Sequence, residues 1–134
     1  MTVGKIDSRE VRSSEDVVLV RRVVRESAVA SGFSLVDQTK LVTAASELAR
    51  NALEHGKGGH MVIEKVANSV KDGLKLVFED KGPGIPDIET ALRDGFTSGG
   101  GMGLGLGGSK RLVNDFHIES EPGKGTRITV VRWK

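Results

Sequence analysis

Apolar residues recur at helical spacing in two segments of the N-terminal half. In residues 13–32 the repeat consists of Val17, Val20, Val24 and Ala28. In residues 34–56 it consists of Leu41, Ala44, Ala45, Leu48 and Ala52. Intervals of three and four residues place these side chains on one helix face. Ser13 and Ser34 are favourable N-caps, so two successive amphipathic helices are predicted.

The pattern changes to short apolar runs further along the chain. Residues 60–68 and 73–80 are rich in valine, leucine and isoleucine, and an Asp-Gly dipeptide at 72–73 favours a tight turn between them. Residues 117–133 predict a second hairpin around the turn at 122–125. Residues 1–12 allow a further strand.

Between the two hairpins the pattern predicts a short helix at 86–96, a flexible loop at 97–108 and a helix at 109–116. Helices and hairpins in this order indicate a single α+β domain over residues 1–134. We expect a two-layer sandwich, with helices on one face of a mixed, mostly antiparallel sheet.

Composition and charge narrow the class of protein. The formal net charge is +2 and cysteine is absent, so the chain does not require a nucleic-acid or anionic-membrane partner, and disulfide and thiol chemistry are excluded. No secretory or membrane-spanning apolar run is present, so we expect a cytoplasmic protein. His55, His60 and His117 lack the spacing of a zinc site.

Glycine is enriched, with 18 residues in 134. Most of the excess falls in residues 82–108, and a second group lies at 56–59. Apolar periodic segments flank both groups, which argues against a disordered low-complexity chain. We interpret both groups as loops built for close approach to a ligand.

The stretch EDKGPGIPD, residues 79–87, places Asp80 at the end of a predicted strand. A buried carboxylate without an ion-pair partner is costly and needs a hydrogen-bond donor, such as an exocyclic amine. Gly82 and Gly84 permit close approach of a ligand or backbone because they lack Cβ atoms. The alternative interpretation is a local Asx-type turn.

Glu47 and Asn51 lie four residues apart, which places them on one helix face. A carboxylate and an amide oxygen at this spacing suit Mg²⁺ and a general base. The alternative is a solvated helix face with an incidental contact.

The glycine-rich run at 99–108 leads into a predicted helix, an arrangement that suits phosphate binding by backbone N–H groups. It does not fit the Walker A pattern, and a dinucleotide-binding βαβ unit does not surround it. A disordered loop is the alternative. Thr126 opens the last strand and offers a hydroxyl group, although alone it indicates only a turn.

The order of four motifs is more specific than any one of them. The motifs ELARNALEH, EDKGPGIPD, GGGMGLGLGGSK and GKGT resemble the N, G1, G2 and GT boxes of the GHKL (Bergerat-fold) ATPase superfamily. The superfamily includes Hsp90 chaperones, type II topoisomerases, MutL and sensor histidine kinases. The resemblance covers residues 34–133. Within it, the chain looks most like the RsbT-type switch kinases of the anti-sigma-factor kinase family.

This resemblance implies ATP and Mg²⁺ as cofactors and a role for each matching residue. Asn51 would bind Mg²⁺, and Glu47 would be the catalytic base. Asp80 would accept a hydrogen bond from adenine, with Gly82 and Gly84 flanking the base and Thr126 beside it. The loop over the phosphates would comprise Gly99, Gly100, Gly101, Met102, Gly103, Leu104 and Gly105.

The resemblance also implies partners. The family phosphorylates a serine or threonine of a STAS-domain antagonist and, when released, activates a PP2C-type phosphatase. The alternative is an ATP-dependent anti-sigma factor that sequesters a sigma factor. A histidine-kinase fragment or an Hsp90- or MutL-type ATPase is less well supported, because a phosphoacceptor helix pair and a transducer domain are missing from the sequence. One departure is Thr97-Ser98, where some relatives carry an arginine for the terminal phosphate.

Overall fold

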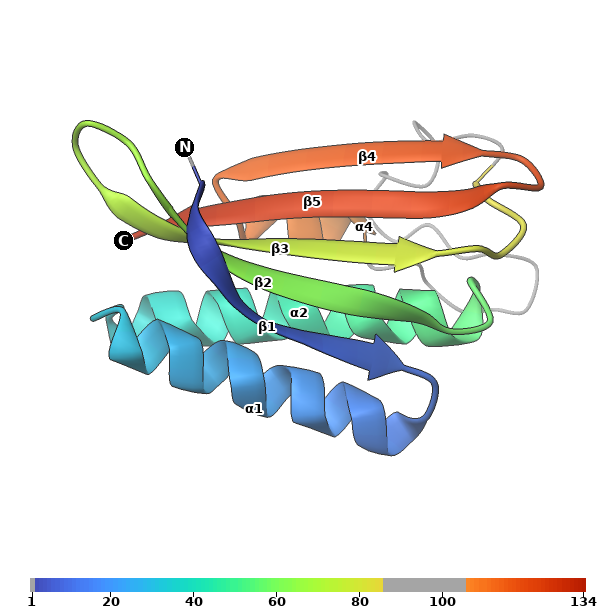
Figure 1. Cartoon of the computed structure of the whole chain (residues 1–134), viewed down its shortest axis with the longest axis horizontal. Coiled ribbons are helices and arrows are strands. Elements are labelled where there is room, and N and C mark those ends of the chain that lie inside the picture. Colours follow the sequence, from blue (N-terminus) through green and yellow to red (C-terminus); the bar gives the residue numbers. More distant parts are fainter. Residues whose placement is uncertain (1, 86–105) are drawn as a thin grey trace.

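The computed structural model describes residues 2–85 and 106–134 (Figure 1). The elements, in chain order, are β1 (Thr2–Val11), α1 (Ser14–Ala30), α2 (Leu35–Glu54), β2 (Gly59–Ala67), β3 (Asp72–Asp80), α4 (Leu106–Arg111), β4 (Asp115–Glu121) and β5 (Gly125–Trp133). The two long helices and both hairpins therefore form where the apolar pattern predicts them, and the N-terminal segment is a strand.

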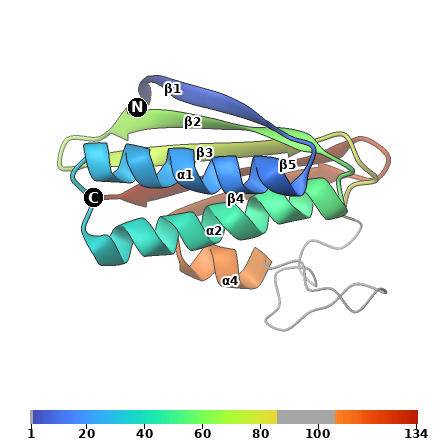
Figure 2. The ribbon, with the colours of Figure 1, turned by 90° about the horizontal axis from the view of Figure 1, so that it is seen from below.

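The five strands form one sheet in the order β1-β2-β3-β5-β4. All four described pairings are antiparallel. The helices α1, α2 and α4 lie on the same side of this sheet (Figure 2). The predicted α+β two-layer fold is therefore confirmed.

The core lies between the sheet and the helix layer because each element turns one apolar face toward the other. Val20 and Val24 of α1 are fully buried, as are Leu41 of α2 and Leu76 of β3. Packing of this kind outweighs the weak helix propensity of the valines in α1. The Ser13 and Ser34 side chains accept hydrogen bonds from backbone N–H groups of the first helical turns, as the sequence predicts.

The predicted helix at 109–116 is wrong in its limits. The helix α4 begins at Leu106, whose side chain is buried in the core, and ends at Arg111. Asp115 and Phe116 instead begin β4 and pair with β5. Cross-strand pairing and burial thus override a local helical pattern. The predicted helix at 86–96, and residues 97–105 of the predicted loop, lie outside the described residues.

No helix in the described ranges has the length and apolar character needed to cross a membrane.

Candidate nucleotide-binding site

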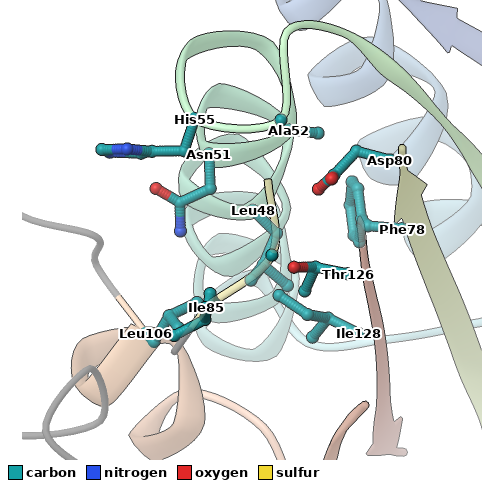
Figure 3. Close-up of a pocket in the computed structure, with 12 residues that line it drawn as sticks. Leu48, Asn51, Ala52, His55, Phe78, Asp80, Ile85, Leu106, Thr126 and Ile128 are labelled. Carbon is teal, nitrogen blue, oxygen red and sulfur yellow. The ribbon is translucent and has the colours of Figure 1, made fainter. Parts of the chain in front are cut away.

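A pocket lies between α2 and the adjoining ends of β3 and β5 (Figure 3). Its walls are largely apolar, with a few polar groups among them. The lining residues are Leu48, Asn51, Ala52, His55, Gly56, Phe78, Asp80, Gly84, Ile85, Leu106, Thr126 and Ile128. An apolar pocket with a small number of polar groups is typical of small-molecule sites.

Asp80 is the acidic group of this pocket. It ends β3, opposite Thr126 of β5, and its carboxylate points toward α2 (Figure 3). Loss of hydration raises the pKa of Asp80, while backbone N–H groups of Gly82 and Thr126 oppose the rise. The Gly82 N–H donates to the carboxylate at 3.0 Å. Within the described ranges no basic side chain forms an ion pair with Asp80, so a ligand can supply the missing donor.

The glycines around Asp80 are explained by close packing. A Cβ atom on Gly56 would overlap the Asp80 carboxylate, and one on Gly82 would lie 2.6 Å from the Cα of Gly56. A larger residue at position 56 would therefore displace the acid, and one at position 82 would displace the backbone of Gly56. Gly56 belongs to the second glycine group in the sequence. Its role is to let the end of α2 approach β3.

The loop after β3 is held in place by the hairpin between β4 and β5. The Gly123 N–H donates to the Pro83 carbonyl at 2.8 Å, and the Ile85 N–H donates to the Ser120 hydroxyl at 2.7 Å. Gly84 has a φ of 79°, a left-handed conformation that favours glycine. These contacts bring Gly84 and Ile85 to the pocket wall.

Thr126 is buried, and its hydroxyl projects toward the pocket (Figure 3). Its Oγ1 lies 2.9 Å from the Ser120 Oγ, so the two hydroxyls share a hydrogen bond. Our sequence analysis missed Ser120. The hairpin register around the predicted turn, which pairs Ser120 with Thr126, is the signal that identifies it.

Asn51 lines the pocket from α2. Glu47 lies one turn earlier and does not line it. The Glu47 carboxylate is partly exposed and pairs with Arg50 at 3.0 Å. His55, which was not predicted as a site residue, lies one turn after Asn51, and its buried Nε2 has no hydrogen-bond partner in the described structure. A bound ligand could satisfy this nitrogen.

The structure therefore brings Asn51, Asp80, Gly84 and Thr126 into one pocket, with Gly82 directly behind the carboxylate. The predicted phosphate-binding residues 99–105 lie outside the described ranges. The cavity itself is small, with a volume of about 30 Å³.

The described residues do not form a ready-made metal site. They contain no group of three or more histidine or acidic side chains placed to hold a metal ion. Asn51 is the residue of α2 that lines the pocket and carries an amide oxygen. One amide oxygen is compatible with Mg²⁺ only if substrate phosphates and water molecules supply the other ligands of the ion.

A family model described as histidine kinase-, DNA gyrase B-, and HSP90-like ATPase matches residues 36–134, and the chain belongs to this family. The serine/threonine-protein kinase RsbT of Bacillus subtilis (strain 168) is 47% identical over 118 residues, which cover 88% of this chain and 89% of that protein. An anti-sigma F factor of Clostridium kluyveri is 33% identical over 99 residues, or 71% of this chain and 70% of that protein.

Solved structures share the fold. The RsbU and RsbW domains of a Mycobacterium tuberculosis protein match with a TM-score of 0.63 and 21% identity, over 96% of this chain and 33% of that one. The catalytic domain of histidine kinase ThkA matches with a TM-score of 0.56 and 19% identity, over 96% of this chain and 97% of that one. The predicted Bergerat-type fold is thus confirmed by structure as well as by family.

Proposed function

We propose that this chain is an ATP-dependent serine/threonine protein kinase of the RsbT type, folded as one domain over residues 1–134. The observation that carries the proposal is the 47% identity with RsbT, which extends over 88% of the chain. The pocket geometry supports it, because a partly desolvated acid without an ion-pair partner among the described residues faces an apolar cavity.

Asp80 recognises the adenine ring in this proposal. Its carboxylate accepts a hydrogen bond from the exocyclic amino group, while the Gly82 N–H fixes the carboxylate orientation. Thr126 adds a hydroxyl beside the base, and Ser120 orients that hydroxyl. The apolar side chains of Phe78 and Ile128 exclude water from the ring.

Asn51 would hold Mg²⁺ through its amide oxygen, and the glycine-rich residues 99–105 would bind the phosphates. When bound, the ion neutralises charge on the phosphates. Glu47 takes the proton from a serine or threonine hydroxyl of the protein substrate. For this step its carboxylate must exchange the Arg50 partner for that hydroxyl.

The protein substrate in this proposal is a STAS-domain antagonist. After release from it, the kinase binds and activates a PP2C-type phosphatase in a bacterial partner-switching pathway of the cytoplasm. The relation to RsbT supports this assignment.

The test is phosphorylation with labelled ATP, Mg²⁺ and STAS-domain proteins from the same genome. We expect transfer by the wild type and a fall of about 10²- to 10⁴-fold in Glu47→Ala, the usual contribution of a general base. ATP binding by this variant should be unchanged in calorimetry. Glu54→Ala is the matched control, because Glu54 is an exposed acid further along α2. Wild-type transfer rates in Glu47→Ala would show that the base is another residue.

A second function follows from the 33% identity with an anti-sigma F factor. In that case the chain sequesters a sigma factor when ATP is bound. Pull-down with purified sigma factors and with STAS proteins, each with and without ATP, distinguishes the two functions. Retention of a sigma factor without phosphorylation of any STAS protein would favour the second.

A further inference from the structure

A second, larger cavity lies on the other side of the loop that joins α2 to β2. This groove has a volume of about 600 Å³. Its lining residues come from the region where β1 and β3 end and β2 begins, and Figure 1 shows these strand ends. Three segments line it. They are Ser8, Arg9 and Glu10 of the edge strand β1 with Arg12 just after it, residues 57–60, and residues 79–81. Asp80 lines both this groove and the candidate nucleotide pocket.

Most of the charged side chains that line the groove are paired, and Asp80, which also lines it, points its carboxylate toward α2 (Figure 3). Glu10 pairs with Arg12 at 2.8 Å, and Glu79 lies 3.7 Å from Arg127. By contrast, Lys57 and Lys81 form no ion pair within residues 2–85 and 106–134, and both are exposed. Two ammonium groups therefore remain available to an anionic ligand.

Lys57 has an unusual backbone conformation. Its φ is 58°, and it is the only residue other than glycine with a positive φ in the described structure. The position ends α2, because the Gly58 N–H returns to the Ala52 carbonyl at 2.8 Å. Glycine or asparagine is normally favoured there, and lysine is less favourable. An unfavourable residue at the wall of a groove points to a role for its side chain.

We propose that this groove binds an acidic segment of a protein partner. The free cations Lys57 and Lys81 come from different segments of a wide groove, an arrangement that suits several carboxylates in a row better than one compact anion. The groove shares Asp80 with the candidate nucleotide pocket, but Lys57 and Lys81 have no part in the machinery assigned above to ATP or to phosphoryl transfer. The proposal therefore does not depend on kinase activity.

The test measures binding of a fluorescein-labelled oligoglutamate peptide by fluorescence anisotropy. We expect binding to the wild type that weakens as salt is added, because exposed charges are screened. Lys57→Asn and Lys81→Ala should each weaken binding about 2- to 5-fold, and the double variant about 4- to 25-fold, as expected for exposed ion pairs. An oligoglutamine peptide of the same length should not bind.

Lys71→Ala is the matched control. Lys71 is an exposed lysine in the turn between β2 and β3, at the opposite end of the hairpin from the groove. This variant should bind the peptide like the wild type. Asparagine tolerates the left-handed conformation, so Lys57→Asn should unfold at the wild-type temperature or above. ATP affinity should also be unchanged, which separates this result from any failure of the proposed kinase function.

Two results would overturn the proposal. The first is equal peptide affinity in the wild type, the double variant and Lys71→Ala. The second is binding of pyrophosphate or phosphatidylserine vesicles with no binding of oligoglutamate, which would assign the groove to a phosphate-bearing ligand instead.

Discussion

Two carboxylates lie at opposite ends of the interface between α2 and the sheet. Asp37, in the first turn of α2, contacts the guanidinium of Arg132 from β5 at 2.6 Å. Asp80 lies beside the last turn of α2, where Gly56 packs against it, and its donors in the described structure are backbone N–H groups. The same residue type thus occupies two contrasting environments in one interface.

The contrast appears in the acidity of the two groups. The hydrogen bond from Arg132 holds the pKa of Asp37 below its ordinary value, whereas loss of hydration raises the pKa of Asp80. A paired acid contributes to folding, because its charged form is stabilised in the native state. An acid without an ion-pair partner retains the capacity to accept a hydrogen bond from a ligand. The first therefore acts as a structural link, and the second is suited to recognition.

The largest expected effect is on nucleotide affinity. Asp80→Asn should raise the Kd for ATP about 10- to 100-fold, because a charge-assisted hydrogen bond contributes about 1.5–3 kcal/mol. Asp37→Asn should leave the Kd unchanged. Isothermal titration calorimetry with ATP and Mg²⁺ measures both.

Asp72→Asn provides a matched control for this experiment, since Asp72 is an exposed acid at the other end of β3. If Asp80→Asn bound ATP as tightly as Asp72→Asn, the assignment of the adenine site to this carboxylate would be wrong.

The next effect is on stability. Asp37→Asn should lower the free energy of unfolding by about 1–2 kcal/mol, because it leaves a largely buried guanidinium without its charged partner. The guanidinium would keep only the hydrogen bond from its Nη1 to the Leu112 carbonyl at 3.0 Å, since its buried Nε lacks a hydrogen-bond partner among the described residues. Urea unfolding measures the change. A loss of the same size in Asp80→Asn would remove the distinction between the two acids.

The smallest effect is on the pH dependence of stability. The contribution of Asp37 is present above its ordinary pKa of 3.8 and is lost as pH falls through its lower folded-state pKa. The contribution of Asp80 to stability changes with pH in the opposite direction. Its contribution is present below 3.8 and is lost as pH rises through its higher folded-state pKa.

Without ATP, Asp80→Asn should therefore be more stable than the wild type at pH 7, by less than about 1 kcal/mol. The difference should shrink as the pH approaches 3.8. The measurement is urea unfolding of both proteins at several pH values between about 3.5 and 7, the range in which protonation of Asp80 affects stability. A difference that grows toward low pH would contradict the sign of the Asp80 shift.

Local patterns in the sequence were sufficient to predict most of the helices and strands and part of the candidate site. The period of three and four predicted α1 and α2, and the Asp-Gly turn predicted the β2–β3 hairpin, because these signals arise between residues close in the chain. Asp80 and the glycines after it were also identified from one short stretch, since a strand that ends on an acid beside glycines is unusual in itself. The order of the four motifs was enough to indicate the family.

The tertiary structure decided what depends on residues far apart in the sequence. It placed Gly56 against Asp80 and Ser120 beside Thr126, paired Asp37 with Arg132, and moved residues 115–116 from a predicted helix into β4. It also brought Lys57 and Lys81 to one groove. No local pattern encodes these neighbours, because burial and charge at each position are set by the surfaces that pack together only when the sheet and the helices have formed.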